Sequence, residues 1–184
     1  MFRYTFLIFA LLFLITSKSV SQNKIKWLTW EEAIEKSKKE KKKIFIDVYT
    51  DWCGWCKKLD KSTFAEDHIA KYINANFYPI KFNAEMEPSI LLKGVEYKFV
   101  QNGNRGYHDL AAQLLQGKMS YPSMVFLDEE YNLIQAIPGF QDINNFEMIS
   151  TYFGSNSHKS VPWNKYMQIF DRYIYFNIAA GKKE

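Results

Sequence analysis

Apolar positions follow the helical period in one early segment of the chain and form an unbroken run in the next. Residues 30–41 repeat apolar side chains at helical spacing, and Thr29 followed by Glu32 fits a capping box at the start of this helix. The run "KIFIDVYT", residues 43–50, is rich in β-branched and aromatic side chains and has the length of a strand. Such a run predicts a central strand that is buried on both faces of a sheet.

The rest of the chain continues this alternation of helices and strands. A helix that carries both cysteines, with Asp51 as its cap, is expected to reach about Phe64. Further helices are predicted at 68–77, 143–153 and 162–177, and further strands at 77–84, 123–128 and 132–137. Pro79 indicates that the first of these strands lies at an edge or starts late. The pattern predicts an α/β fold in one domain, 22–184, with a central mixed sheet flanked by helices on both faces.

Residues 86–118 interrupt this order as an insert before the last predicted hairpin. Within it, "SILLKGVEYKF" fits a hairpin that turns at Lys93-Gly94, and "HDLAAQLLQG" fits a helix that ends at Gly117. The predicted helix at 162–177 follows a polar break and is an addition at the other end of the fold.

The N-terminus carries a short apolar segment that is typical of a secretory signal peptide. Arg3 precedes an apolar run at residues 4–16, which is shorter than the ~20 residues of a membrane span. Small residues, Ser19 and Ser21, favour cleavage after Ser21. We therefore expect a signal peptide at 1–21 and a periplasmic mature protein; the alternative is an uncleaved segment that anchors the protein in the membrane, facing the periplasm.

Composition and charge restrict the partners of this domain. The 184 residues are 47% hydrophobic and carry a formal net charge of +4, which suits one folded domain. Much of the positive charge is a lysine-rich stretch at 36–43. No arginine cluster or aromatic RNA-binding motif accompanies it, so a solvated helix end explains it better than a nucleic-acid site. We expect no nucleic-acid partner.

The chain has two cysteines, Cys53 and Cys56, separated by two residues. Such a pair can be an inert disulfide, half of a metal site or a redox-active pair. A structural staple is a poor explanation because the ring is very small and constrains little of the unfolded chain. Structural zinc needs about four ligands, haem attachment needs a histidine where Lys57 stands, and the histidines are scattered. We therefore expect no metal or small cofactor beyond a redox-active Cys53–Cys56 disulfide.

A cysteine at the start of a helix is suited to attack a disulfide. Free backbone N–H groups and the positive end of the helix dipole stabilise its thiolate. Cys53 is expected at that place, and Cys56 lies one turn later on the same face. Cys53 would attack a substrate disulfide, and Cys56 would then resolve the mixed disulfide.

Asp47 stands among apolar residues of the predicted central strand. Desolvation would raise the pKa of its carboxyl group toward the range that is useful for acid–base chemistry. The alternative is a carboxylate that reaches solvent at the strand end.

With these residues in place, the sequence resembles the thioredoxin superfamily. The segment "FIDVYTDWCGWCK", residues 45–57, looks like the strand, W-C-x-x-C motif and following lysine of that family. The similarity extends over about 27–153 and is closest to exported bacterial thioredoxin-like proteins. It implies a thioredoxin-like fold and thiol–disulfide exchange, with the insert at 86–118 and the C-terminal helix as additions.

The resemblance also implies roles for residues far from the cysteines. Tyr121-Pro122 matches the cis-proline of the family, and Tyr121 would contact an extended substrate segment. Asp47 matches a buried acid that handles the proton of the second cysteine, and Lys81 is a candidate partner for this acid. Gly139 matches a glycine that lets substrate approach; the alternative is an ordinary turn glycine.

The residues around the cysteines depart from ordinary thioredoxin in one respect. Gly54-Trp55 stands where thioredoxin has Gly-Pro, and this pair tunes thiol pKa and redox potential. The potential of thioredoxin therefore does not carry over. Trp52 and Trp55, with Gly54 between them, are candidates for a flat apolar rim that binds protein substrates; the alternative is simple packing beside the helix.

The sequence thus predicts a thiol–disulfide oxidoreductase that acts on protein disulfides through Cys53 and Cys56. We expect a monomeric reductant or isomerase outside the cytosol, with a membrane thiol reductase as a candidate electron donor. Two alternatives stay open: a thioredoxin-fold binding or chaperone module, and a redox sensor whose cysteines do not turn over substrate disulfides.

Overall fold

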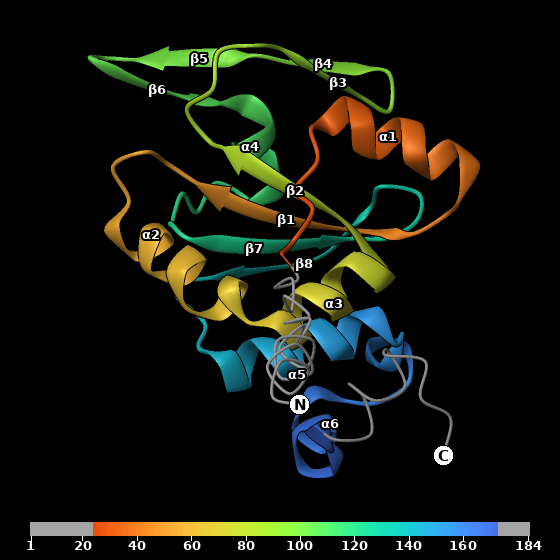
Figure 1. Ribbon diagram of the computed structural model, residues 1–184. Coiled ribbons are helices and arrows are strands. Elements are labelled where there is room, and N and C mark those ends of the chain that lie inside the picture. Colours follow the sequence, from red (N-terminus) through yellow and green to blue (C-terminus); the bar gives the residue numbers. More distant parts are fainter. Residues whose placement is uncertain (1–23, 173–184) are drawn as a thin grey trace, which may run out of the picture.

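A four-stranded mixed sheet forms the centre of the computed structural model, which describes residues 24–172 (Figure 1). The strand order is β2-β1-β7-β8, with β1 parallel to β2 and antiparallel to β7, and β7 antiparallel to β8. The strands are β1 (Lys43–Tyr49), β2 (Phe77–Asn83), β7 (Ser123–Leu127) and β8 (Leu133–Pro138). β2 lies at an edge of this sheet, as Pro79 indicated.

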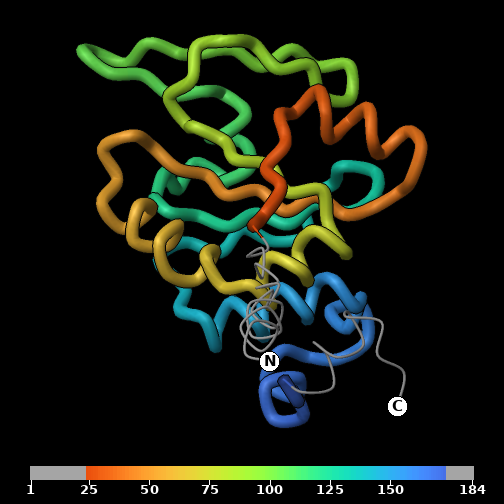
Figure 2. Tube along the Cα trace, in the orientation of Figure 1, coloured from red at the N-terminus to blue at the C-terminus, as the bar shows by residue number. Residues whose placement is uncertain are grey.

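Helices cover both faces of the sheet, as the sequence predicted. One core cluster joins the sheet to α1 (Trp30–Lys39) and α4 (Asp109–Leu114). The other joins it to α2 (Gly54–Lys61), α3 (Asp67–Asn76), α5 (Ile143–Gly154) and α6 (Trp163–Ile169). Figure 2 shows α1 on one side of the sheet and α2, α3 and α5 on the other. This is a mixed α/β, thioredoxin-like arrangement.

Strand β1 separates the two cores. Ile44, Ile46 and Val48 face the α1 side, whereas Phe45 faces the α2 side, and all four are fully buried. The prediction of a central strand buried on both faces is confirmed. Asp47 shares the parity of Phe45, so alternation along the strand points its carboxyl group toward the α2 side.

The insert contains more regular structure than the sequence predicted. The hairpin of β3 (Ile90–Leu92) and β4 (Val95–Tyr97) turns at Lys93-Gly94, as expected, with both φ angles positive. A second hairpin, β5 (Phe99–Asn102) and β6 (Arg105–His108), was not predicted. Its strands are mostly polar and lack a clear alternation, although Asn102-Gly103 is a turn signal.

Two expectations about α2 need correction. Asp51 does not cap α2: Cys53 is the N-cap, and the Asp51 carboxylate accepts a hydrogen bond from Asn83 instead. Helix α2 ends at Lys61 and gives way to a 3₁₀ turn, η1 (Thr63–Ala65), because Ser62 leaves helical dihedrals.

The last predicted helix, 162–177, is shorter within the described residues. Helix α6 ends at Ile169 because Phe170 takes an extended backbone conformation. A second 3₁₀ turn, η2 (Ser157–Lys159), precedes α6. Residues 173–177 and the predicted signal peptide, 1–21, lie outside the described residues. No helix within residues 24–172 combines the length and apolar character that a membrane crossing needs.

Candidate redox site at the Cys53–Cys56 disulfide

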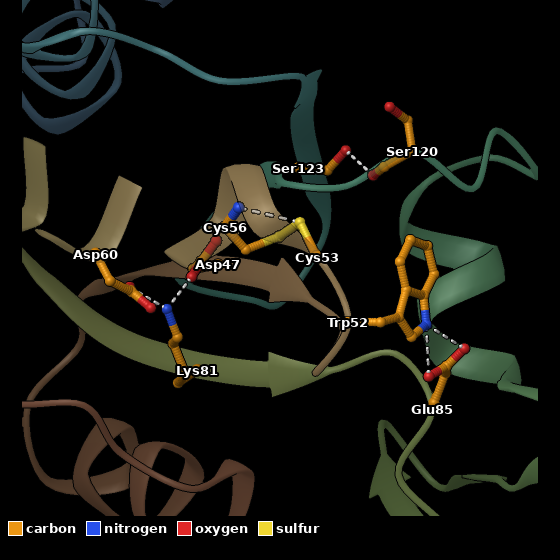
Figure 3. Close-up of a disulfide and its surroundings, with 9 residues drawn as sticks. All are labelled: Asp47, Trp52, Cys53, Cys56, Asp60, Lys81, Glu85, Ser120 and Ser123. Atoms are coloured by element: carbon orange, nitrogen blue, oxygen red, sulfur yellow. Dashed lines mark hydrogen bonds and ion pairs between the residues drawn. A yellow bond between two sulfur atoms is a disulfide. The ribbon is translucent and has the colours of Figure 1, made fainter. Parts of the chain in front are cut away.

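Cys53 and Cys56 form a disulfide at the start of α2, with Cα atoms 5.3 Å apart (Figure 3). Cys53 is the N-cap of α2, and its Sγ accepts a hydrogen bond of 3.0 Å from the Cys56 N–H. The predicted place of Cys53 at a helix N-terminus is therefore confirmed. After reduction, the same N–H groups and the helix dipole would stabilise a thiolate on Cys53.

Exposed aromatic side chains neighbour the cysteines of the disulfide. Trp52 and Trp55 are each 57% exposed, whereas both cysteines are buried. The Trp52 ring meets Tyr121 edge to face at 5.9 Å, and the Trp55 ring lies 5.5 Å from Phe140. These two pairs form an apolar rim, and Gly54 between the cysteines leaves open space where a side chain would stand.

The Tyr121-Pro122 peptide bond is cis, as the resemblance implied. Ser123, the next residue, pairs with Val48 near the end of β1, so Pro122 lies at the end of the sheet where the chain leaves β1 toward Cys53. The Pro122 carbonyl accepts a hydrogen bond of 2.8 Å from the Gly139 N–H, and Gly139 has a φ of 87°, which favours glycine. The structure therefore brings Tyr121, Pro122 and Gly139 together beside the disulfide.

Asp47 lies beneath α2 and is fully buried. Its partner in the parallel register of β1 and β2 is Lys81, whose Nζ donates to Asp47 Oδ2 at 2.5 Å. The same Nζ donates to the carboxylate of Asp60, on α2 (Figure 3). Asp47 Oδ1 has no hydrogen-bond partner within the described residues. Lys81 thus bridges a buried carboxyl group and a surface carboxylate.

Burial has the largest effect on the pKa of Asp47. Desolvation and, to a smaller extent, the charge of Asp60 raise the pKa of Asp47 to about 6, against the attraction and hydrogen bond of Lys81. For Lys81, burial lowers the pKa, but the attraction and hydrogen bonds of Asp47 and Asp60 outweigh it, so the pKa rises. A charged lysine therefore faces a carboxyl group that can exchange a proton near neutral pH.

Asp60 and Glu85 belong to the site and were not predicted. Asp60 lies four residues after Cys56, so it shares one face of α2 with that cysteine. That spacing was a signal available in the sequence. Glu85 accepts a hydrogen bond of 3.0 Å from the Trp52 indole on each of its carboxylate oxygens. No local pattern indicates this contact, because it joins Trp52 to the segment that follows β2.

The described residues contain no cluster of three or more His, Cys, Asp or Glu side chains that could hold a metal ion. What the site does contain is a disulfide at a helix N-terminus, an apolar rim and a buried carboxyl group, an arrangement that suits thiol–disulfide exchange.

Known proteins resemble this chain in parts of its length. Spermatogenesis-associated protein 20 of Rattus norvegicus is 32% identical over 87 residues, which are 47% of this chain and 11% of that protein. The thiol:disulfide interchange protein DsbD of Haemophilus influenzae is 25% identical over 136 residues, 72% of this chain and 20% of that protein. The chain therefore spans between a tenth and a fifth of the length of these curated relatives.

Solved structures agree on the fold. A thioredoxin-fold protein from Helicobacter pylori matches with a TM-score of 0.53 and 15% identity, covering 77% of this chain and 86% of that one. A thioredoxin from Thermus thermophilus matches with a TM-score of 0.52 and 12% identity, covering 70% and 86%. At these identities the likeness shows a thioredoxin-like fold.

A family model described as "Thioredox_DsbH: Protein of unknown function, DUF255" matches residues 15–149, which is most of the chain. The model spans the central strand, the disulfide, the insert and the cis-proline hairpin. The chain therefore belongs to the Thioredox_DsbH family of thioredoxin-like proteins.

Proposed function

We propose that this protein is a thiol–disulfide oxidoreductase that acts on protein disulfides through Cys53 and Cys56. The observation that carries the proposal is the disulfide at the N-terminus of α2, flanked by two exposed tryptophans and set above the buried Asp47. The family and the DsbD relative, whose name is thiol:disulfide interchange protein, support this chemistry.

The first step is an attack by the reduced protein. The Cys53 thiolate forms a bond to one sulfur of a substrate disulfide, the substrate S–S bond breaks, and its other sulfur leaves as a thiolate. Trp52, Trp55 and the Tyr121-Pro122 and Gly139 backbone would hold an extended substrate segment at this point.

The second step releases the substrate. Cys56 loses its proton and attacks Cys53 Sγ, so the Cys53–Cys56 bond forms and the mixed disulfide breaks. Two electrons have then passed to the substrate, whose two thiolates take protons from water. We assign Asp47 as the acceptor of the Cys56 proton, because a pKa of about 6 leaves it ionised yet basic enough at neutral pH. A dithiol protein must then reduce the disulfide.

We propose that this cycle runs outside the cytosol, in the direction of reduction or isomerisation, with a membrane thiol reductase as donor. The apolar run at 4–16 and the small residues before Gln22 support export. Mass spectrometry of the exported protein tests this: we expect a chain that begins at Gln22, and an intact Met1 contradicts cleavage. The equilibrium potential of the disulfide against glutathione tests direction, since about −270 mV indicates a reductase and about −120 mV an oxidant.

Reduction of insulin with a thiol donor tests the activity itself. We expect Cys53→Ser to abolish turnover and Cys56→Ser to accumulate a mixed disulfide with substrate. Lys61→Ala, an exposed change at the end of α2, serves as the control and should keep wild-type turnover. Full activity of Cys53→Ser would rule out the mechanism, whereas a wild-type protein without reductase activity would favour a binding or chaperone module.

A further inference from the structure

The second hairpin of the insert reaches back to the redox site. The Arg105 guanidinium, at the first residue of β6, lies over the Trp52 ring at 5.7 Å from its centroid. In Figure 1 the β5–β6 hairpin projects on the side of the molecule where α2 begins. The Trp52 ring is thereby bounded by Arg105, by Tyr121 and by Glu85. The insert therefore forms part of the wall beside the disulfide.

The second exposed tryptophan, Trp55, also has a cation over its ring. Lys58 Nζ lies 4.6 Å from the Trp55 ring centroid and 5.2 Å from that of Phe140. An aromatic face attracts a cation and holds it in place without neutralising its charge. Each exposed indole beside the disulfide thus presents a positive group to a substrate.

These cations lack partners of opposite charge within the described residues. Arg105, Lys58 and the neighbouring Lys57 are exposed, and none of them makes an ion pair there. The exposed cations beside the two tryptophans therefore remain available to a bound molecule.

The carboxylates nearby are already engaged. Glu85 is half-buried and accepts from the Trp52 indole, and Asp51 accepts from the Asn83 amide. Asp47 and Asp60 both accept from Lys81. Internal hydrogen bonds thus hold these carboxylates in place, whereas Arg105, Lys57 and Lys58 are exposed.

We propose that Arg105 and Lys58 select protein substrates whose disulfide is flanked by acidic residues on an extended segment. An arginine fork over Trp52 and a lysine ammonium over Trp55 can each pair with a carboxylate of the bound segment. This inference rests on the proposed thiol–disulfide exchange and names its substrate class.

Three synthetic peptides test the selection. They share one disulfide-containing sequence and carry glutamate, glutamine or lysine on both sides of the disulfide. With the full-length protein and a thiol donor, we expect kcat/KM for the glutamate peptide to exceed that for the glutamine peptide by about fivefold, with the lysine peptide lowest. The ratio of kcat/KM for the glutamate peptide to that for the glutamine peptide should fall toward one as ionic strength rises from about 0.02 M to about 0.5 M.

Variants at Arg105 and Lys58 test whether these two residues cause the charge preference. We expect Arg105→Gln and Lys58→Gln each to reduce the glutamate-to-glutamine ratio by about twofold, and Arg105→Glu to favour the lysine peptide. Lys98→Gln is the matched control, because Lys98 lies in the insert and pairs with Glu96 instead of facing Trp52. It should keep the wild-type ratio.

The outcomes separate this inference from the proposed function. Wild-type protein that reduces the glutamine peptide but shows no charge preference overturns the inference and leaves the oxidoreductase intact. The inference is likewise overturned if Arg105→Gln and Lys58→Gln both keep the wild-type ratio. Failure to reduce any of the three peptides overturns the proposed function, and the inference falls with it.

Discussion

At Asp47, burial and a neighbouring charge shift the pKa of the carboxyl group in opposite directions. It is fully buried, yet its carboxyl group faces the ammonium group of Lys81 at 2.5 Å. Burial is the larger effect, and the pKa rises to about 6. Without that burial the carboxylate would be a weaker base, and without Lys81 the pKa of the carboxyl group would be higher still.

Replacing Asp47 by Asn should slow the release of substrate and leave the first attack largely intact. Asparagine keeps the shape of the side chain but cannot accept the Cys56 proton. We expect insulin turnover at pH 7 to fall by about 10- to 100-fold and the mixed disulfide on Cys53 to accumulate. Asp67→Asn on α3 is the control. Unchanged turnover of Asp47→Asn would remove Asp47 from the mechanism.

Replacing Asp60 by Asn should lower the pKa of Asp47. Asp60 raises that pKa by its own charge and shares Lys81 with Asp47, so its removal leaves the ammonium group to Asp47 alone. Carbon-13 NMR titration of the aspartate carboxyl groups measures the change. A pKa of Asp47 that stays at about 6 or rises contradicts the bridging role of Lys81.

Two elements, α2 and the β5–β6 hairpin, bring residues from distant parts of the chain to the candidate site. Helix α2 begins at the disulfide, and its later turn supplies Asp60 to Lys81. The β5–β6 hairpin lies outside the central sheet and places Arg105 over Trp52. The hairpin depends on close cross-strand packing, because the Phe99 ring covers Gly106, and a Cβ at Gly106 would overlap that ring.

A valine at Gly106 should therefore disrupt the hairpin and the placement of Arg105. We expect Gly106→Val to destabilise the fold by about 1–3 kcal/mol in urea unfolding, because the Phe99 ring must move. Phe99→Ala in the same protein removes the clash and should recover part of the loss, whereas Phe99→Ala alone should destabilise. Additive effects of the two changes would show that Phe99 and Gly106 do not contact each other.

At the scale of the whole molecule, the buried carboxyl group links stability to pH. The folded pKa of Asp47 lies above its ordinary value of 3.8, so the folded state holds the proton more tightly than the unfolded state does. The contribution of Asp47 to the free energy of unfolding is therefore fully present below about pH 4 and is lost as the pH rises toward 6. A rise in pKa from 3.8 to about 6 corresponds to about 3 kcal/mol.

A comparison of two proteins isolates this effect from the other titrating groups. We expect oxidised Asp47→Asn to exceed the wild type in free energy of unfolding by about 3 kcal/mol at pH 7, and by almost nothing at pH 3.5. Urea unfolding across this range measures the difference. A difference that does not change with pH would mean that Asp47 titrates normally in the folded state.

The sequence and the structure agree most closely where signals are local. The capping box at Thr29, the buried run of β1 and the turn at Lys93-Gly94 all depend on neighbouring residues, and all three are confirmed. The β5–β6 hairpin was missed because its strands are polar, and Asp51 was wrongly expected to cap α2 because Cys53 can fill that place with its sulfur.

The sequence by itself determined the cysteine spacing, the central strand with its buried acid, and the order of helices and strands, because each of these depends on short-range patterns of side chains. Only the tertiary structure decided which groups meet. The register of β1 with β2 sets Lys81 beside Asp47, and α2 brings Asp60 to the same ammonium group. The fold of the insert brings Arg105 to Trp52. Such contacts join residues distant in the chain, so they exist only once the sheet has fixed its register and the insert has packed against it.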